Sequence, residues 1–506
     1  MSTWNNLIKF LNLRTLACIG LFILTFFNLY YTDGDFFWQI KTGQYIFENL
    51  SIPSVDIFSY TKEGQPWFVQ EWGYELIIYT LYRLSDSLVF IKFFITTIAI
   101  LLLFINYKIV KQFNKNSYFA FFLAYIFWIP STMGVAFRPH MLTYLFFILT
   151  LRILLYYSLF PKTKIIWWLP IIFFLWVNVH AAFLLGVILL LIFLLAEFIQ
   201  LKFNGNFFQS KSAFYSLLFC SFISILATLL NPYFVNEWIY PFQVISLKVL
   251  NNNVSEWQGL DFHSFSSQVL LALILLTLFT AIFSKRKPSL FVTFIFFSFL
   301  FLAFTAQRHL PLAMFAMTPF AAITIYHFPY KLLFKHSFSF NLSQKFLKFK
   351  SLGGDLGHKE YFLNWMILFL MIISSIYYYP KYKIIEDDEF NKKFPVKEVE
   401  YIASHHLNGK ILNDVNIGGF ILYKIPHQKV FYDGRLDVYG DDFANEYFKM
   451  IHGSPDWEEI FNSYHFDYVL IPRNLPLRQL LLMRGDFKLT VDSDKFSLLV
   501  SKDLAL

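Results

Sequence analysis

Charged residues are scarce in this sequence of 506 residues, at 15%, whereas hydrophobic residues make up 57% and aromatic residues 21%. A soluble core of this length cannot cover so much apolar side chain, so lipid must cover much of it. The formal net charge is +8, but Lys and Arg occur in short clusters between apolar runs. That distribution is typical of membrane anchors and argues against a nucleic-acid partner. The composition therefore predicts an α-helical polytopic membrane protein.

Cysteine is nearly absent as well. Only Cys18 and Cys220 occur, both inside apolar runs, which argues against a disulfide framework and against a thiolate metal site. The histidines lack a His-x-x-x-His spacing, so a zinc site is not supported. The first apolar run, about 15 to 31, does not end in a small-residue cleavage site. This run is therefore predicted to be a retained signal anchor.

Long apolar runs are abundant, and a membrane-spanning helix needs about 20 mostly apolar residues. Eleven candidate spans are predicted, starting near residues 15, 86, 117, 139, 165, 182, 212, 266, 289, 310 and 361. The stretch 72–84 is too short to span and carries Glu75 and Arg83. It is predicted to be a helix that lies in the membrane surface.

The Lys and Arg residues between the spans indicate the orientation. Loops on one side carry 18 of them, whereas the longer loops on the other side carry 6. Cytoplasmic loops carry the positive excess, so the N-terminus is predicted to be cytoplasmic and the C-terminal domain extracytoplasmic, at the inner (plasma) membrane. The predicted domains are a transmembrane part, 1–380, with outer loops 32–85 and 231–265, and a soluble α/β domain, 381–506.

With this orientation, many polar residues fall at outer helix ends or in outer loops. Burying a charge in hydrocarbon costs roughly 2.5 to 3.5 kcal/mol on insertion scales, so such residues usually face a cavity or a partner. The alternative is that they lie in the headgroup layer.

The first outer loop contains Asp33-Gly34-Asp35 and ends with Glu71 and Glu75. Two carboxylates separated by one glycine can share a divalent cation such as Mg or Mn, or one can bind metal while the other accepts a proton. The four carboxylates are thus candidate catalytic residues, with Asp33 and Asp35 the candidate metal ligands. The alternative for the aspartates is a turn or N-cap before a helix over 36–49.

Arginines mark two later outer helix ends, in Phe137-Arg138-Pro139-His140 and Gln307-Arg308-His309. Arg138 and Arg308 are candidates to bind an anionic phosphate through charge-assisted hydrogen bonds. The alternative is a structural pair with Glu or Asp. Other candidate binding residues at this side are His140, His180, Glu256, Asp261, His263 and His309.

The C-terminal domain alternates helical and strand patterns, which predicts a small α/β fold. The predicted helices are near 396–407, 441–451 and 455–463, and the predicted strands are 410–413, 428–432, 466–471, 486–491 and 495–500. Asp433-Gly434-Arg435 follows a predicted strand, where α/β proteins bind ligands. Asp433 and Arg435 are therefore candidates for a lid or acceptor-docking surface, and the alternative is a turn with an internal ion pair.

Several of these segments together resemble a family of bacterial multi-pass proteins classed with the GT-C glycosyltransferases. They are Asp33 to Gly43, Pro53 to Glu75, Arg138-Pro139-His140, Asn178-Val179-His180, Glu256 to His263, Arg308 to Pro311, Asn413 and Asp433-Gly434-Arg435. The resemblance covers most of the chain. In many GT-C enzymes the acidic residues are adjacent, whereas here Gly34 separates them.

The resemblance implies a membrane glycosyltransferase of the cell envelope, acting on hexosyl or pentosyl groups. It would move a sugar from a polyprenyl-phosphate donor to an extracytoplasmic glycan, lipid or protein, and Asp33 or Asp35 would activate the acceptor or hold the metal. A single displacement would invert the anomeric carbon, with Asp33 the first candidate for base. A transporter, a lipid-handling protein or a non-catalytic scaffold is the alternative, although transporters tend to show inverted repeats and none is found here.

Overall fold

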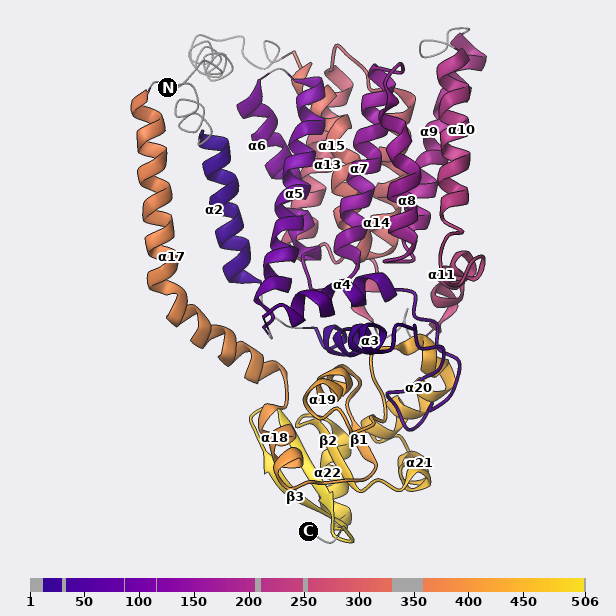
Figure 1. The fold of residues 1–506 in the computed structure, drawn as a ribbon, viewed down its shortest axis with the longest axis vertical. Helices are drawn as coiled ribbons and strands as arrows, with labels where there is room; N and C mark the ends of the chain where they lie inside the picture. Colours follow the sequence, from indigo (N-terminus) through magenta and orange to yellow (C-terminus); the bar gives the residue numbers. More distant parts are fainter. Residues whose placement is uncertain are drawn as a thin grey trace. The chain divides into compact units, whose positions relative to one another are not determined.

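The structure is a computed structural model that describes residues 12–29, 33–85, 87–114, 116–204, 211–248, 254–329 and 358–504. The chain, traced in Figure 1, forms two compact units. The first unit is made of Met1–Asn28, Phe93–Trp238 and Ser255–Tyr377, and the second of Leu29–Lys92, Ile239–Val254 and Tyr378–Leu506. The predicted first outer loop therefore packs in the same unit as the C-terminal residues. The predicted domain boundary at 380 concerns where the chain leaves the membrane and stays a prediction.

The first unit is helical, as its long apolar runs predict. Its α-helices are α2 (Leu13–Asn28), α6 (Ser117–Trp128), α7 (His140–Leu159), α8 (Leu169–Val177), α9 (Phe183–Asn204), α10 (Lys211–Ala227), α13 (Phe265–Phe283), α14 (Leu290–Thr305) and α15 (Leu310–Tyr326). Short 3₁₀ turns are η1 (Pro130–Gly134), η2 (Lys164–Trp168), η3 (Ser255–Trp257) and η4 (Gln307–His309). Three helices run from one unit into the other: α5 (Val89–Phe113), α11 (Asn236–Ser246) and α17 (His358–Lys393).

Among the residues that the structure describes, five helical segments are long and apolar enough to cross a membrane, judged by length and composition: Val89–Phe113, His140–Leu159, Phe183–Gln200, Phe265–Phe283 and Gln307–Tyr326. Six shorter apolar helices accompany them: Arg14–Asn28, Ser117–Trp128, Lys164–Val177, Lys211–Ala227, Leu290–Thr305 and Asn364–Tyr377. Each predicted span thus corresponds to an apolar helix. The prediction that all eleven cross the membrane stays open to test.

Helix α15 lies in the interior of the first unit, since every side chain from Leu310 to Thr324 is buried. Helices α13 and α14 both pack against it. Their opposite faces expose large apolar side chains, among them Phe279 on α13 and Phe301 on α14. Such exposed faces are unfavourable in water, so a lipid surround follows from the packing as well as from the composition.

The second unit combines surface helices with a small sheet. Its helices are α3 (Asp35–Asn49), α4 (Trp72–Arg83), α18 (Val396–Ser404), α19 (Gly418–Lys424), α20 (Leu436–His452), α21 (Trp457–Tyr464) and α22 (Pro476–Arg484), with the 3₁₀ turn η6 (Val415–Ile417). Its strands are β1 (Ile411–Asn413), β2 (Tyr468–Pro472), β3 (Phe487–Asp492) and β4 (Phe496–Ser501), in the order β1-β2-β4-β3. Strands β1 and β2 are parallel, whereas β4 is antiparallel to both β2 and β3.

The loop between α3 and α4 joins the C-terminal residues by backbone hydrogen bonds. Tyr60 N donates to Val430 O at 3.2 Å, and Val430 N donates to Phe58 O at 3.1 Å. The Tyr60 hydroxyl donates to Ile411 O in β1 at 2.9 Å. The loop is therefore hydrogen-bonded to the segment at Val430 and to strand β1.

Helix α3 is anchored to the C-terminal residues by aromatic packing. Phe37 is fully buried, and its ring meets those of Phe394 and Phe420 with centroids 5.0 Å and 5.4 Å away. Edge contacts of this kind add to the stabilisation from apolar burial. The helix predicted over 36–49 is confirmed, and so is a short helix over the stretch 72–84.

The small α/β pattern of the C-terminal residues is confirmed, but one predicted strand is wrong. Residues 428–432 form a single parallel bridge, between Ser59 and Val430, because their neighbour is one short loop segment instead of a full strand. Two helices were not predicted. Helix α19 begins with Gly418-Gly419, which is a poor helix signal, and α22 is short and begins with Pro476, a residue suited to a first helical turn.

Candidate functional site

Two sets of polar residues carry the candidate chemistry, and each lies within one unit. We call Asp33, Asp35, Glu71 and Glu75 the acidic set; all four belong to the second unit. We call Arg138, His140, His180, Glu256, Arg308 and His309 the basic set, and all of these belong to the first unit.

Asp33 and Asp35 form a turn at the start of α3. Asp33 Oδ1 accepts a hydrogen bond from the backbone N–H of Asp35 at 3.1 Å, and Asp35 Oδ1 accepts one from Trp38 Nε1 at 3.2 Å. Both aspartates are half-buried. The turn considered from the sequence is therefore present, and it fixes one oxygen of each carboxylate without removing the carboxylates from the surface.

Glu71 precedes α4 and is held by two amides. Its Oε2 accepts a hydrogen bond from Gln39 Nε2 at 2.7 Å, and its Oε1 accepts one from Gln70 Nε2 at 2.9 Å. Because Gln39 lies on α3, this contact links the two helices that carry the acidic set. Glu71 is half-buried, so it lies between the interior and the surface of the unit.

Glu75 is one turn further along α4 and is 1% exposed. Within the described ranges, neither of its carboxyl oxygens has a hydrogen-bond partner. Burial raises the pKa of Glu75 well above its ordinary value, the Glu71 carboxylate raises it further, and Arg435 acts in the opposite direction. Burial therefore favours the protonated form of Glu75 in the folded chain.

The acidic set does not form a complete metal site by itself. Among the residues that the structure describes, no group of three or more His, Cys, Asp or Glu side chains is placed to hold a metal ion. Asp33 and Asp35 would supply two carboxylates, and hard cations need six or more oxygen ligands. We therefore derive no step through a cation, and the metal role of Asp33 and Asp35 stays a prediction.

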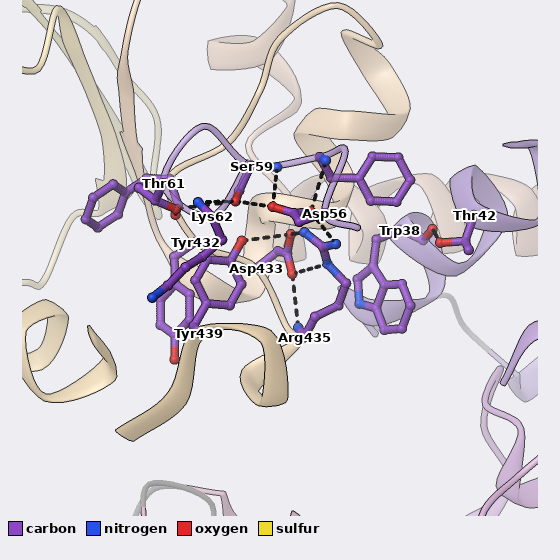
Figure 2. Close-up of polar contacts among 12 residues, drawn as sticks. Trp38, Thr42, Asp56, Ser59, Thr61, Lys62, Tyr432, Asp433, Arg435 and Tyr439 are labelled. Carbon is purple, nitrogen blue, oxygen red and sulfur yellow. Dashed lines mark hydrogen bonds and ion pairs between the residues drawn. The ribbon is translucent and has the colours of Figure 1, made fainter. Parts of the chain in front are cut away.

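A buried ion triad lies beside the acidic set (Figure 2). Arg435 Nη1 is 2.6 Å from Asp56 Oδ1, and Arg435 Nη2 is 2.6 Å from Asp433 Oδ2. The three side chains are at most 1% exposed. The guanidinium also lies over the Trp67 ring, 4.5 Å from its centroid. Asp56 and Trp67 come from the loop between α3 and α4, so Arg435 joins this loop to the C-terminal residues.

Neighbouring hydroxyl and backbone groups complete the triad. The hydroxyl of Tyr439 donates to Asp433 Oδ2 at 3.1 Å, and Ser59 donates to Asp56 through both its backbone N–H and its hydroxyl (Figure 2). Burial alone would raise the pKa of Asp56, but the charge of Arg435 and these hydrogen bonds outweigh it and lower the pKa. Arg435 therefore pairs with both buried carboxylates, which matches the internal ion pair considered for Asp433 and Arg435. A ligand-binding role for these two residues stays a prediction.

Asp56 was not among the candidate residues selected from the sequence. It lies 379 residues from Arg435 along the chain, and no local spacing relates the two. Aromatic residues stand near both positions in the sequence, but that signal does not identify a pair. Only the packing of the loop between α3 and α4 against the C-terminal residues reveals it.

Arg138 in the basic set forms an ion pair with Glu256, with Nη1 3.1 Å from Oε2. The pair is open to the surface, since 26% of the Arg138 side chain and 43% of the Glu256 side chain are exposed. Arg308 lies over the Trp257 ring at 4.5 Å from its centroid. Both arginines therefore contact η3, and the structural pairing with Glu considered for Arg138 is present.

Two histidines of this set, His140 and His180, are held by hydrogen bonds. His140 Nε2 is 2.8 Å from Gly134 O, and His180 Nδ1 is 2.9 Å from the hydroxyl of Thr143. Burial lowers the pKa of His180 well below its ordinary value, and the charges of Arg308, His140 and Arg138 lower it further. Burial and these charges therefore favour the neutral imidazole of His180.

Asp261 and His263, the other two candidate binding residues of the first unit, lie outside the basic set. They lie in an exposed turn before α13, where Asp261 Oδ1 accepts a hydrogen bond from the backbone N–H of His263 at 2.9 Å. The Ser264 hydroxyl donates to Asp261 O at 2.7 Å. This geometry accounts for Asp261 as a turn residue, and a binding role for either residue stays a prediction.

Comparison with known proteins finds a similar fold in solved structures of two membrane enzymes. No family model and no curated protein sequence matches the chain. AglB, the oligosaccharyltransferase of Archaeoglobus fulgidus, was solved with an inhibitory peptide and a dolichol-phosphate; it matches with a TM-score of 0.59 at 10% identity over 93% of this chain and 69% of that chain. An apo structure of the A. fulgidus enzyme matches with a TM-score of 0.54 at 12% identity over 88% of this chain and 66% of that chain.

ArnT from Cupriavidus metallidurans, bound to undecaprenyl phosphate, matches with a TM-score of 0.51 at 9% identity over 96% of this chain and 97% of that chain. The chain thus spans about two thirds of the archaeal enzyme and nearly all of ArnT. At these identities the likeness shows the fold alone. The predicted resemblance to the GT-C glycosyltransferases is confirmed at that level.

Proposed function

We propose that this chain is a membrane glycosyltransferase that moves a sugar from a polyprenyl-phosphate donor to an acceptor on the extracytoplasmic side. The observation that carries the proposal is the shared fold with AglB and ArnT, whose structures hold a dolichol-phosphate and undecaprenyl phosphate. The acidic set at the start of α3 and α4 supports it, because a transferase of this kind needs a carboxylate near the acceptor hydroxyl.

In the proposed reaction the donor phosphate binds to the basic set. Arg138 and Arg308 supply two guanidinium groups, which suit the geometry of phosphate oxygens. The Arg138–Glu256 pair is partly exposed, so a phosphate can replace Glu256 as the partner of Arg138. Neutralising the phosphate makes it a better leaving group.

The acidic set then activates the acceptor. The Asp33 carboxylate takes the proton of the acceptor hydroxyl, and the acceptor oxygen attacks the anomeric carbon of the sugar. The bond from that carbon to the lipid-phosphate oxygen breaks, and the phosphate leaves with the electron pair. One such displacement inverts the anomeric carbon. Asp35 is proposed as the second carboxylate of the site, and Glu71 and Glu75 as the next candidates.

The orientation of the chain is part of the proposal. The 18 to 6 distribution of Lys and Arg supports a cytoplasmic N-terminus and an extracytoplasmic C-terminal domain at the inner membrane. Two single-cysteine variants test it, Glu63→Cys and Lys285→Cys, each at an exposed position and in a background without Cys18 and Cys220. A membrane-impermeant maleimide should label the Glu63→Cys variant in intact cells, and the Lys285→Cys variant only after permeabilisation.

The test of function is sugar transfer by the purified protein in detergent from radiolabelled polyprenyl-phosphate sugars, covering hexoses and pentoses, with and without EDTA. We expect transfer from at least one donor, and loss of that transfer in EDTA if a cation is required. Absence of transfer from every donor, in protein that is folded, would favour the transporter or scaffold alternative.

A further inference from the structure

The start of α3 meets the C-terminal residues at a contact made by backbone atoms. A Cβ placed on Gly34 would overlap the carbonyl oxygen of Asn416, and a Cβ placed on Gly419 would overlap the carbonyl oxygen of Gly34. Overlap with backbone is costly because backbone atoms have little freedom to move. Glycine at 34 and at 419 therefore permits an approach that no other residue type allows.

A third glycine meets the acidic set itself. A Cβ on Gly434 would overlap Asp35 Oδ1, and the three atoms nearest to it all belong to the Asp35 carboxyl group. The Asp35 carboxylate therefore lies directly against the Gly434 backbone. The same Oδ1 accepts the hydrogen bond from Trp38 Nε1, so the carboxylate is confined from two sides.

Both C-terminal turns that make these contacts are themselves fixed. Asp414 Oδ1 accepts hydrogen bonds from the backbone and side-chain nitrogens of Asn416, each at 3.0 Å, and Asp414 Oδ2 accepts one from Tyr447 at 3.0 Å. At the other turn, Asp433 Oδ1 accepts the backbone N–H of Arg435 at 3.0 Å. Gly434 lies between these two members of the buried triad.

We propose that the C-terminal domain is a positioning element of the acidic site, in which the turns at Asn416–Gly419 and Asp433–Arg435 hold Asp33-Gly34-Asp35 and Gly434 sets the direction of the Asp35 carboxylate. This inference rests on the proposed function for its catalytic meaning. The domain is then part of the active site and not an appended lid, because the acidic residues take their geometry from it.

The consequence is that Gly434 acts through Asp35. An added methyl group at 434 must push the Asp35 carboxylate out of its place, since that carboxylate is the movable partner of the contact. A displacement of about 1 Å at a reacting group costs up to roughly 100-fold in rate. The lipid-phosphate contacts proposed for the basic set are not touched by this change.

The experiment is a double-mutant cycle of Gly434→Ala and Asp35→Ala, measured as apparent Tm in detergent. We expect Gly434→Ala to lower Tm by several degrees in the wild-type background and to leave it unchanged in the Asp35→Ala background, where the overlapping carboxylate is gone. In the transfer assay, Gly434→Ala is expected to lower kcat by roughly 10- to 100-fold with an unchanged KM for the donor.

Gly485→Ala is the matched control in the same domain. Gly485 has a φ of 81° and nothing within 4 Å of an added Cβ, so alanine there adds backbone strain without a contact. It is expected to lower Tm equally in both backgrounds and to leave kcat unchanged.

The outcomes separate this inference from the proposed function. An equal Tm loss from Gly434→Ala in both backgrounds would overturn the positioning role, even if the wild type transfers sugar. A Tm loss that depends on Asp35, in a protein that transfers from no donor, would establish the contact and overturn the glycosyltransferase proposal. A fall in kcat together with a Tm loss that depends on Asp35 would support both the positioning role and the proposed function.

Discussion

One arginine of each unit, Arg435 and Arg138, is held in a different way. Arg435 in the second unit is 1% exposed and lies between Asp56 and Asp433, both of them fully buried. Arg138 in the first unit pairs with Glu256, and both side chains of that pair reach the surface. From the sequence, Arg138 was a candidate for binding phosphate and Arg435 a candidate for a lid or acceptor-docking surface.

The difference separates a structural role from a ligand-binding one. Removing one partner of a buried ion pair leaves an uncompensated charge and is strongly destabilising, whereas exposed pairs contribute little. An arginine with two buried carboxylates already has its charge satisfied. An arginine in one open pair can exchange a carboxylate for a phosphate at little cost to the fold.

The largest effect is expected from Arg435→Ala, because it leaves Asp56 and Asp433 buried without their cation. We expect a loss of about 3 to 5 kcal/mol of stability, measured as a fall in apparent Tm in detergent. The matched control is Arg473→Ala, which breaks a surface pair with Asp492 in which 48% of the arginine side chain is exposed. This control should cost within about 1 kcal/mol, and similar losses for both variants would contradict the comparison.

A smaller effect, on binding alone, is expected at the open pair. Arg138→Gln should weaken binding of polyprenyl phosphate by roughly 10- to 150-fold, since a hydrogen bond to a charged group contributes about 1.5 to 3 kcal/mol. Glu256→Gln should strengthen binding, because it removes the carboxylate that competes for Arg138. Binding to detergent-solubilised protein by tryptophan fluorescence or calorimetry measures both. Equal weakening in the two variants would show that the pair is structural.

The smallest effect is a pH dependence at Glu75. At low pH both the folded and the unfolded chain carry the proton, but above the ordinary value of 4.5 only the folded chain keeps it, because its pKa is raised. The folded state therefore loses stability as pH rises towards the raised pKa. Glu75→Gln removes this loss, so its apparent Tm should exceed that of the wild type at about pH 8 and match it at about pH 5.

The control for this pH dependence is Glu459→Gln, a change at an exposed residue in α21. Its Tm should follow the wild-type curve at every pH. Parallel curves for Glu75→Gln and the wild type would mean that Glu75 does not hold its proton in the folded state.

Helices with a strong apolar signal could be predicted from the sequence. The predicted spans correspond to apolar helices because their length and composition leave few alternatives. The helix α3 was predicted closely from its amphipathic pattern. The helices α19 and α22 were not predicted, because a helix that begins with two glycines or with proline gives no periodic signal over so few residues.

Candidate site residues could be proposed from the sequence, but their partners could not. Asp33, Asp35 and the arginines were visible as charges at predicted helix ends. Asp56 was not selected, and the contacts of Gly34, Gly419 and Gly434 were not predicted, because each depends on residues several hundred positions apart. Whether the selected residues act in catalysis is a question for experiment.

The most direct test of the account is Asp33→Asn, examined for donor binding and for sugar transfer in the same preparation. The account predicts protein that melts and binds polyprenyl phosphate like the wild type but transfers sugar roughly 10²- to 10⁴-fold more slowly, since the general base is lost. Transfer at the wild-type rate by this variant would contradict the account, because the chemistry would then not depend on the carboxylate at the start of α3.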